Sequence, residues 1–216
     1  YAVLDGDFGT KMLDSMENAC GLKGLGYFES CTYRELSSNK EVHTPADLKG
    51  MKVRVMQSNL HIAIWESLGA IPSAIAFGEL YTALSQGTVD AQDNPLELVI
   101  SQKFYEVQKY ITLTNHIFQV GMATCNPAWF NSLSAEDQQV VMDAIRAGVE
   151  FQRKEAAAQK ENYITTLEDA GLTVITLTDA ELAEFQALMG SAEDVIATNV
   201  GADLVAELKD SIKAVS

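Results

Sequence analysis

The sequence predicts an α/β fold. Short β-type runs of apolar residues alternate along the chain with stretches in which apolar residues recur at helical spacing. One helical stretch, from Ser134 to about Asp169, contains no proline and a single glycine, Gly148, so it can form one helix about 54 Å long. A helix of that length exceeds a small domain, and we expect it to span two domains. The alternative is a pair of helices with a bend near Gly148.

The other elements follow from local periodicity and from residues that begin or end helices. Gly21, Gly69 and Gly87 each follow an amphipathic stretch as a C-terminal cap, and Ser58 precedes one as an N-terminal cap. Pro72 is expected to break the chain. The helices predicted before the long one cover residues 8–19, 58–68, 77–86 and 94–104, and two or three amphipathic helices finish the chain. The predicted strands cover residues 25–29, 32–36, 52–56, 88–92, 110–114, 118–125 and 173–176.

The composition argues against nucleic-acid-binding and membrane-spanning proteins. Asp plus Glu total 30 and Lys plus Arg total 15, which gives a formal net charge of −15 at pH 7. Such an acidic surface repels a phosphate backbone, and we expect no nucleic-acid partner. No apolar run reaches the roughly 18 residues of a membrane span. Because the same charge repels small anions at long range, an anion site has to depend on a local, desolvated cation.

No motif indicates a metal, a cofactor or a catalytic nucleophile. The three cysteines lack a C-x-x-C spacing and the three histidines lack an H-x-x-x-H spacing: Cys20, Cys31, Cys125, His43, His61 and His116. The glycines of residues 21–26 stand in the wrong order for a dinucleotide loop. We therefore expect no cofactor, no metal and no enzymatic activity. The alternative functions are an enzyme whose Cys–His pair meets only in the fold, and an interaction module that uses the long helix as its contact surface.

Arg54 is the residue that most strongly indicates a ligand. It lies in the strand 52–56, where alternation places Val53 and Val55 on one face and Lys52 and Arg54 on the other. A buried guanidinium cannot lose its charge and needs an anionic partner, and its planar fork matches a carboxylate through two hydrogen bonds. Arg54 is therefore either a clamp for a ligand carboxylate, or an exposed strand residue or a member of an internal ion pair.

Three more residues have both a structural and a functional interpretation. Arg34 lies on a predicted strand, where the same alternatives hold, and neighbouring Glu35 indicates a segment that tolerates charge. Asn94 stands between a strand and a helix, where it can contact a ligand or cap the helix. Phe77 precedes a helix in a glycine-containing turn, where it can stack on a ligand or fill the core.

Four motifs occur together in one order. They are T-P-A-D-L-K-G-M-K-V-R-V at residues 44–55, A-F-G-E-L-Y-T-A-L-S-Q-G-T-V-D-A-Q-D-N-P at residues 76–95, F-Y-E-V-Q-K-Y at residues 104–110 and T-N-H at residues 114–116. In order and spacing they resemble the substrate-binding proteins of tripartite ATP-independent periplasmic (TRAP) transporters, the DctP-like family. The resemblance covers nearly the whole chain and is strongest over residues 24–131.

The resemblance implies a two-lobed, periplasmic-binding-protein-like α/β fold with a hinge and a long domain-spanning helix. It implies a periplasmic protein that captures a small organic anion and delivers it to the membrane permease subunits of a transporter. Arg54 matches the arginine that forms a salt bridge with the ligand carboxylate, and Asn94 an asparagine that hydrogen-bonds the ligand. Arg34 matches a second carboxylate-facing arginine of sialic-acid-type members, and Phe77 an aromatic residue lining the cleft. Asp93 stands where glutamate is more usual.

Members of the family are longer than this chain, which begins at Tyr1. We therefore expect the first lobe to be incomplete. Residues 1–31 would be the remainder of lobe I and residues 32–116 the ligand-anchoring lobe II. Residues 117–216 would return to lobe I and supply the long connecting helix and the C-terminal helices. An incomplete lobe leaves strand edges unpaired, and we offer dimerisation or strand swapping through it as a hypothesis.

Overall fold

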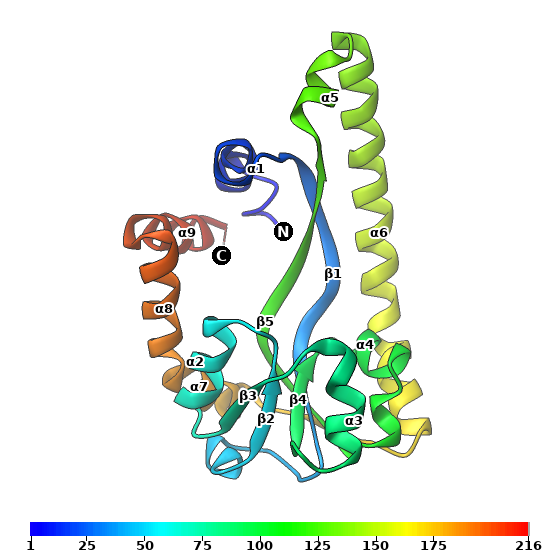
Figure 1. Cartoon of the computed structure of the whole chain (residues 1–216), viewed down its shortest axis with the longest axis vertical. Helices are drawn as coiled ribbons and strands as arrows, with labels where there is room; N and C mark the ends of the chain where they lie inside the picture. The colour runs from blue at the N-terminus through cyan, green and yellow to red at the C-terminus, as the bar shows by residue number, and fades with distance from the viewer. Residues whose placement is uncertain (216) are drawn as a thin grey trace. The chain divides into compact units, whose positions relative to one another are not determined.

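A computed structural model describes the backbone of residues 1–215, and their side chains apart from those of residues 30–32 and 191 (Figure 1). The α/β prediction is confirmed: strands β3-β2-β4-β1-β5-β6 form one six-stranded sheet in that order. The strands are β1 (Lys23–Ser38), β2 (Lys52–Val55), β3 (Ile71–Ala74), β4 (Ala91–Asn94), β5 (Tyr110–Cys125) and β6 (Thr173–Thr176).

Helices and 3-10 turns make up most of the rest of the chain. The α-helices are α1 (Asp7–Cys20), α2 (Asn59–Ser67), α3 (Leu80–Ser85), α4 (Leu96–Ser101), α5 (Pro127–Ser132), α6 (Ala135–Asp169), α7 (Asp179–Leu188), α8 (Gly190–Val200) and α9 (Ala202–Val215). The 3-10 turns are η1 (Pro45–Leu48), η2 (Phe77–Glu79) and η3 (Phe104–Glu106). Among residues 1–215, no helix combines the length and the hydropathy that crossing a bilayer requires.

The chain divides into two compact units. Unit 1 contains residues 1–32 and 119–158 together with α9, and unit 2 contains residues 33–118 and 159–201. Strands β1 and β5 and helix α6 each contribute residues to both units. Unit 2 therefore includes residues 159–201, which the sequence interpretation assigned to the return to lobe I. The expected division at residues 31/32 and 116/117 stays a prediction, and Cys31 and Thr32 at its first boundary lie outside the described side chains.

Unit 2 is built on the sheet, with two clusters of buried apolar side chains. β2 runs parallel to β3 and β4, β1 runs antiparallel to β4, and β5 runs parallel to β6. One cluster joins β2 to α2, α7 and α8 and contains the fully buried Trp65. The other joins α3, α4 and β5 to the end of α6, where Leu167 is fully buried. The β4 strand, which carries the buried polar residues Gln92, Asp93 and Asn94, thus lies inside the sheet with β1 and β2 as its neighbours.

Unit 1 is held by contacts between α1, α6 and the first half of β1. Tyr27 Oη donates a hydrogen bond to the Gly9 carbonyl oxygen over 2.9 Å. Arg153 on α6 donates to both carboxylate oxygens of Asp5 and to the Tyr27 carbonyl oxygen. Its guanidinium carbon also lies 3.8 Å from the centroid of the Tyr1 ring. These contacts tie the N-terminal segment to the long helix within this unit.

Several expectations about elements were wrong. Pro72 does not break the chain but lies in β3, which is an edge strand and so tolerates a residue without a backbone N–H. Residues 23–38 form one strand rather than two, as do residues 110–125. The strand expected at residues 88–92 is β4 at Ala91–Asn94, and α5 was not predicted. The long helix is one element from Ala135 to Asp169, so the alternative with a bend near Gly148 is also wrong.

Two helical glycines should respond to alanine in opposite directions. Gly9 in α1 is buried, and a Cβ atom there would lie 1.8 Å from the Leu4 carbonyl oxygen. Gly148 in α6 has open space around the same position. We expect Gly9→Ala to lower the free energy of unfolding by about 1–3 kcal/mol through overpacking. Gly148→Ala should raise it by up to about 1 kcal/mol through helix propensity. Urea denaturation of both variants checks this, and equal shifts of one sign would contradict it.

Candidate ligand-anchoring site

Arg54 is a buried cation on β2, which lies between the edge strand β3 and β4. It occupies β2 between the fully buried Val53 and Val55, and only 2% of its surface is exposed. Its Nε donates a hydrogen bond to the Ile75 carbonyl oxygen over 2.9 Å, and its guanidinium carbon lies 5.8 Å from the centroid of the Phe77 ring. Among the residues with described side chains, no acid forms an ion pair with it. The positive charge therefore has an aromatic face beside it and no native carboxylate bound to it.

On balance, the surroundings of Arg54 disfavour its positive charge. Burial lowers the pKa of its guanidinium, the nearby carboxylate of Asp93 raises it and the charge of Arg34 lowers it. An arginine side chain nevertheless keeps its proton in proteins. The desolvation cost is consequently not relieved by neutralisation, and an anion that enters the site would relieve it.

Arg34 is the second arginine of the region, and a native acid already binds it. It lies on β1 with 4% of its surface exposed. Its Nε donates to Asp93 Oδ2 over 3.1 Å and its Nη2 to Asp93 Oδ1 over 3.3 Å, to the Asp93 carbonyl oxygen and to Asn94 Oδ1 over 3.1 Å. The neighbouring Glu35 is also buried, with 3% of its surface exposed, so this segment holds two charged residues inside the protein. Arg34 has the internal ion pair that was one of the two alternatives.

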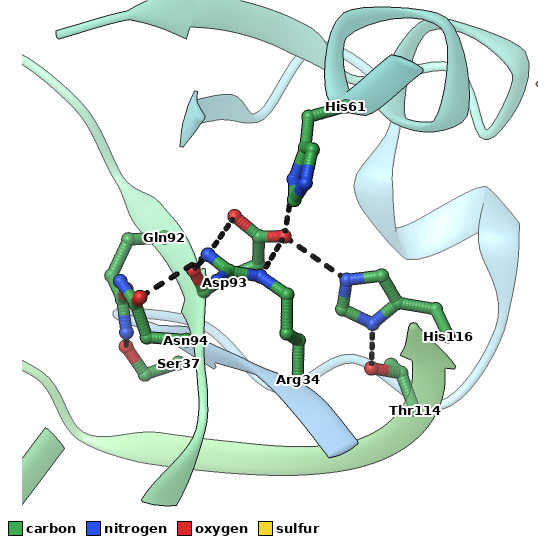
Figure 2. Close-up of polar contacts among 8 residues, drawn as sticks. All are labelled: Arg34, Ser37, His61, Gln92, Asp93, Asn94, Thr114 and His116. Atoms are coloured by element: carbon green, nitrogen blue, oxygen red, sulfur yellow. Dashed lines mark hydrogen bonds and ion pairs between the residues drawn. The ribbon is translucent and has the colours of Figure 1, made fainter. Parts of the chain in front are cut away.

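Asp93 is the centre of this polar cluster (Figure 2). It is fully buried, and its Oδ2 lies 3.1 Å from Arg34 Nε, 3.2 Å from His61 Nδ1 and 3.1 Å from His116 Nε2. Burial by itself would raise the pKa of Asp93, but hydrogen bonds from His116 and His61 and the charges of His116 and Arg34 hold that pKa well below its usual range. An ionised carboxylate only accepts hydrogen bonds, so the ring nitrogen that each histidine turns toward Asp93 donates.

Asn94 ends β4 and joins the cluster to a chain of amides. Its Nδ2 donates to Gln92 Oε1, Gln92 Nε2 donates to Ser37 Oγ over 2.7 Å, and Ser37 Oγ donates to Gln108 Oε1 over 3.2 Å. The helix-cap alternative for Asn94 is wrong, since Pro95 occupies the N-cap position of α4 and the Asn94 side chain faces Gln92 and Arg34 instead (Figure 2). The orientation of its amide is thus fixed on both sides.

The structure brings the four candidate residues into one region of unit 2. Three of them lie on neighbouring strands of the sheet: Arg54 on β2, Asn94 on β4 and Arg34 on β1. The fourth, Phe77, joins them because its ring lies beside the Arg54 guanidinium. Sequence analysis missed Asp93, His61 and His116 as members. The signal that could have revealed Asp93 is the polar run Gln92-Asp93-Asn94 on a strand whose four residues are all buried. Among the described residues, no group of His, Cys, Asp and Glu side chains could hold a metal ion.

A separate cavity of about 470 Å³ lies in unit 1. Its lining comes from the start of the chain, β1 and α6, and includes Leu13, Lys23, Ile145 and Arg146. None of the four candidate residues lines it. The cavity therefore belongs to unit 1 and is distinct from the polar site of unit 2.

Comparison with known proteins places the chain among solute-binding proteins. Residues 1–198 match the family described as bacterial extracellular solute-binding protein, family 7 (DctP). The chain is 38% identical over 207 residues to the 2,3-diketo-L-gulonate-binding periplasmic protein YiaO of Escherichia coli K12, covering 95% of this chain and 62% of that protein. This chain thus spans about three fifths of the length of that relative.

Two solved structures share the fold closely. One is a TRAP periplasmic solute-binding protein from Ochrobactrum anthropi, with a TM-score of 0.91 and 34% identity over 99% of this chain and 66% of the other. Another is the sugar-acid-binding protein DctPAm from Advenella mimigardefordensis in complex with galactonate, with a TM-score of 0.88 and 32% identity over 100% of this chain and 69% of the other. The chain therefore belongs to the DctP family of bacterial extracellular solute-binding proteins.

Proposed function

We propose that this chain is the anchoring part of a periplasmic TRAP solute-binding protein, and that Arg54 binds the carboxylate of a small organic acid. The observation that carries the proposal is the contrast between the two arginines. Arg34 is paired with Asp93, whereas Arg54 is equally buried and forms no ion pair with the described residues. A ligand carboxylate that forms two hydrogen bonds to Arg54 would supply the missing anion.

The other candidate residues fit subordinate roles. Phe77 is 42% exposed and lies over the Arg54 guanidinium, so its ring can cover the apolar side of a ligand while it supports the cation. Asn94 is held by Gln92 and Arg34 and would add a directed hydrogen bond. The role expected for Arg34 as a second carboxylate contact stays a prediction. Because the carboxylate of Asp93 already balances the charge of Arg34, Arg34 should attract a ligand anion less strongly than Arg54 does.

The relatives favour a sugar acid or another small carboxylate as the solute. The E. coli relative is named for binding 2,3-diketo-L-gulonate, and the A. mimigardefordensis protein is in complex with galactonate. We propose capture by closure of two lobes, transfer to membrane permease subunits and no enzymatic activity. Closure follows solute binding only as far as the ligand makes better contacts in the closed form.

A thermal-shift screen tests the proposed function. Intact protein is heated with galactonate, 2,3-diketogulonate, succinate and sialic acid, and with galactose as an uncharged match for galactonate. An acid present at 100 times its Kd should stabilise the protein by about 2.7 kcal/mol and raise Tm accordingly. Galactose should leave Tm unchanged because it lacks the carboxylate. Equal stabilisation by galactose and galactonate would contradict anchoring through Arg54.

A further inference from the structure

A second buried carboxylate, that of Glu35, lies beside the anchor site, by which we mean Arg34, Arg54, Asp93 and Asn94. Glu35 follows Arg34 on β1, and its register partner on β4 is Asn94. Glu35 Oε2 accepts a hydrogen bond from the backbone N–H of Asn115 over 2.9 Å. The Glu35 carboxylate is therefore hydrogen-bonded to the backbone of β5.

The backbone that Glu35 holds has an unusual conformation. Asn115 has a φ of 45°, one of two positive values among the non-glycine residues that the structure describes. Left-handed backbone is unfavourable for residues with a Cβ atom, although asparagine tolerates it better than most. Such a conformation persists only where its surroundings hold it. The hydrogen bond from Asn115 N–H to Glu35 is such a restraint.

Asn115, the residue of β5 with positive φ, lies between two members of the cluster. Thr114 precedes Asn115 and His116 follows it. Thr114 Oγ1 lies 2.7 Å from His116 Nδ1, while His116 Nε2 lies 3.1 Å from Asp93 Oδ2 (Figure 2). The conformation at residue 115 thus determines where the His116 ring points. A change there would withdraw one of the three groups that hold the Asp93 carboxylate.

We propose that Glu35 is a positioning residue of the anchor site: its ionised carboxylate holds the left-handed backbone of Asn115, which directs His116 onto Asp93 and so keeps Arg34 and Asn94 in place. The inference rests on the proposed function in that these residues surround the ligand. Glu35 itself touches no ligand in this scheme. Its effect passes through Asn115, His116 and Asp93 in that order.

The ionisation of Glu35 should occur within the neutral pH range. Burial raises the pKa of Glu35 to about 7, and the backbone hydrogen bonds of Asn115 and Thr114 and the charge of Lys160 on α6 oppose that rise. The other charged or titratable groups of the cluster are Arg34, Asp93, His61 and His116. As the pH falls through about 7, the carboxyl group becomes protonated and accepts from the Asn115 N–H more weakly.

Stability and affinity should then respond to pH in opposite directions. The folded-state pKa of Glu35 lies above its ordinary value of 4.5. Its contribution to stability is therefore complete below about pH 4.5 and is lost as the pH rises through about 7. Positioning of His116 requires the ionised form and improves over the same rise. A residue with only a structural role would move stability and affinity together.

The ligand-free protein allows a direct test by NMR. The carboxyl carbon of Glu35 and the amide proton of Asn115 should share one pH midpoint near 7, and the signals of His116 should contain a component that follows the ionisation of Glu35. In Glu35→Gln this shared component should vanish from Asn115 and His116, while exposed His43 stays as in the wild type. The control is Thr112→Val, a change on the same strand as Asn115 that removes the buried hydrogen bond from Thr112 Oγ1 to the Val42 carbonyl oxygen. This variant should retain the shared component.

Calorimetry then measures the consequence for binding. The probe is whichever of galactonate, 2,3-diketogulonate and succinate gives the largest thermal shift. If the ionised form alone binds well, the affinity at pH 6 should be about one tenth of that at pH 8, because about one molecule in eleven is then competent. Glu35→Gln should lose this tenfold component, and Thr112→Val should keep it.

The outcomes separate this inference from the proposed function. Asn115 and His116 signals that ignore the Glu35 midpoint in the wild-type protein would overturn the positioning role, and that measurement needs no variant to fold. A tenfold pH effect that persists in Glu35→Gln would overturn it as well. If the NMR midpoints coincide but none of the three acids binds, the positioning of His116 stands and anchoring of an acid by this site fails.

Discussion

Arg54→Ala should weaken the binding of the solute acid by about 30- to 5,000-fold, which corresponds to roughly 2–5 kcal/mol. The ligand carboxylate would then be buried without a counter-charge, beside the aromatic ring of Phe77. Isothermal titration calorimetry on the intact protein measures the ratio directly. Because Arg54 forms no ion pair with the described residues, its removal leaves no acid of the protein unpaired. The loss should therefore appear in affinity rather than in Tm of the ligand-free protein.

Two further variants control this prediction. Lys52→Ala removes the same charge from the same strand at an exposed position and should leave the affinity within a factor of a few. Arg54→Lys keeps the charge but replaces the planar fork with a single ammonium group, so it should fall between wild type and alanine. Wild-type affinity in Arg54→Ala would refute the anchoring role of this residue.

Asp93→Asn should lower the free energy of unfolding by about 3–5 kcal/mol, because it breaks the buried ion pair between Asp93 and Arg34. The amide of asparagine would also turn a donor toward one of the groups that now donate to the carboxylate. Urea denaturation at pH 7 provides the measurement. Asp90→Asn, a change at a less buried carboxylate that accepts from the Lys52 backbone N–H, is the matched control and should cost much less.

The pH dependence of that difference has a definite sign. The folded-state pKa of Asp93 lies well below its ordinary value of 3.8. Its stabilising contribution is therefore complete above about pH 4 and is lost as the pH falls toward the lower, folded-state pKa. The gap in stability between wild type and Asp93→Asn should be widest in the neutral range and narrow in acid. A variant as stable as wild type at pH 7 would show that the ion pair contributes no net stability.

Local sequence patterns predicted the part of the site that depends on one strand. The alternation around Arg54 predicted that its side chain lies on the strand face opposite Val53 and Val55, and it left open whether that face is buried. Pro72 was misjudged because the permissive position is an edge of the sheet, and edge position is a property of the assembled sheet. Residues 110–125 were divided in two because Asn115 interrupts the apolar pattern without ending the strand.

The cluster around Asp93 could not be predicted in the same way. Its histidine partners are 32 and 23 positions away along the chain, on α2 and β5. His116 ends the T-N-H motif and His61 belongs to none, but neither pattern indicates an acid partner, and only tertiary packing brings both rings to the same oxygen. The contact of Glu35 was not predicted for a related reason, since its partner is the backbone N–H of Asn115, a residue with a positive φ value. Side-chain chemistry alone carries no sign of such a partner.

The crossing of chain segments between the two units has a consequence for biosynthesis. Unit 2 is assembled from residues 33–118 and 159–201, so it is not a continuous stretch of polypeptide. A nascent chain that ended at Ala158 would already contain every residue of the anchor cluster, yet its apolar clusters would lack Leu167, Leu172, Ile175 and Phe185. The apolar clusters of unit 2 can therefore be completed only when much of the remaining chain is available, and non-local closure of this kind favours slow folding.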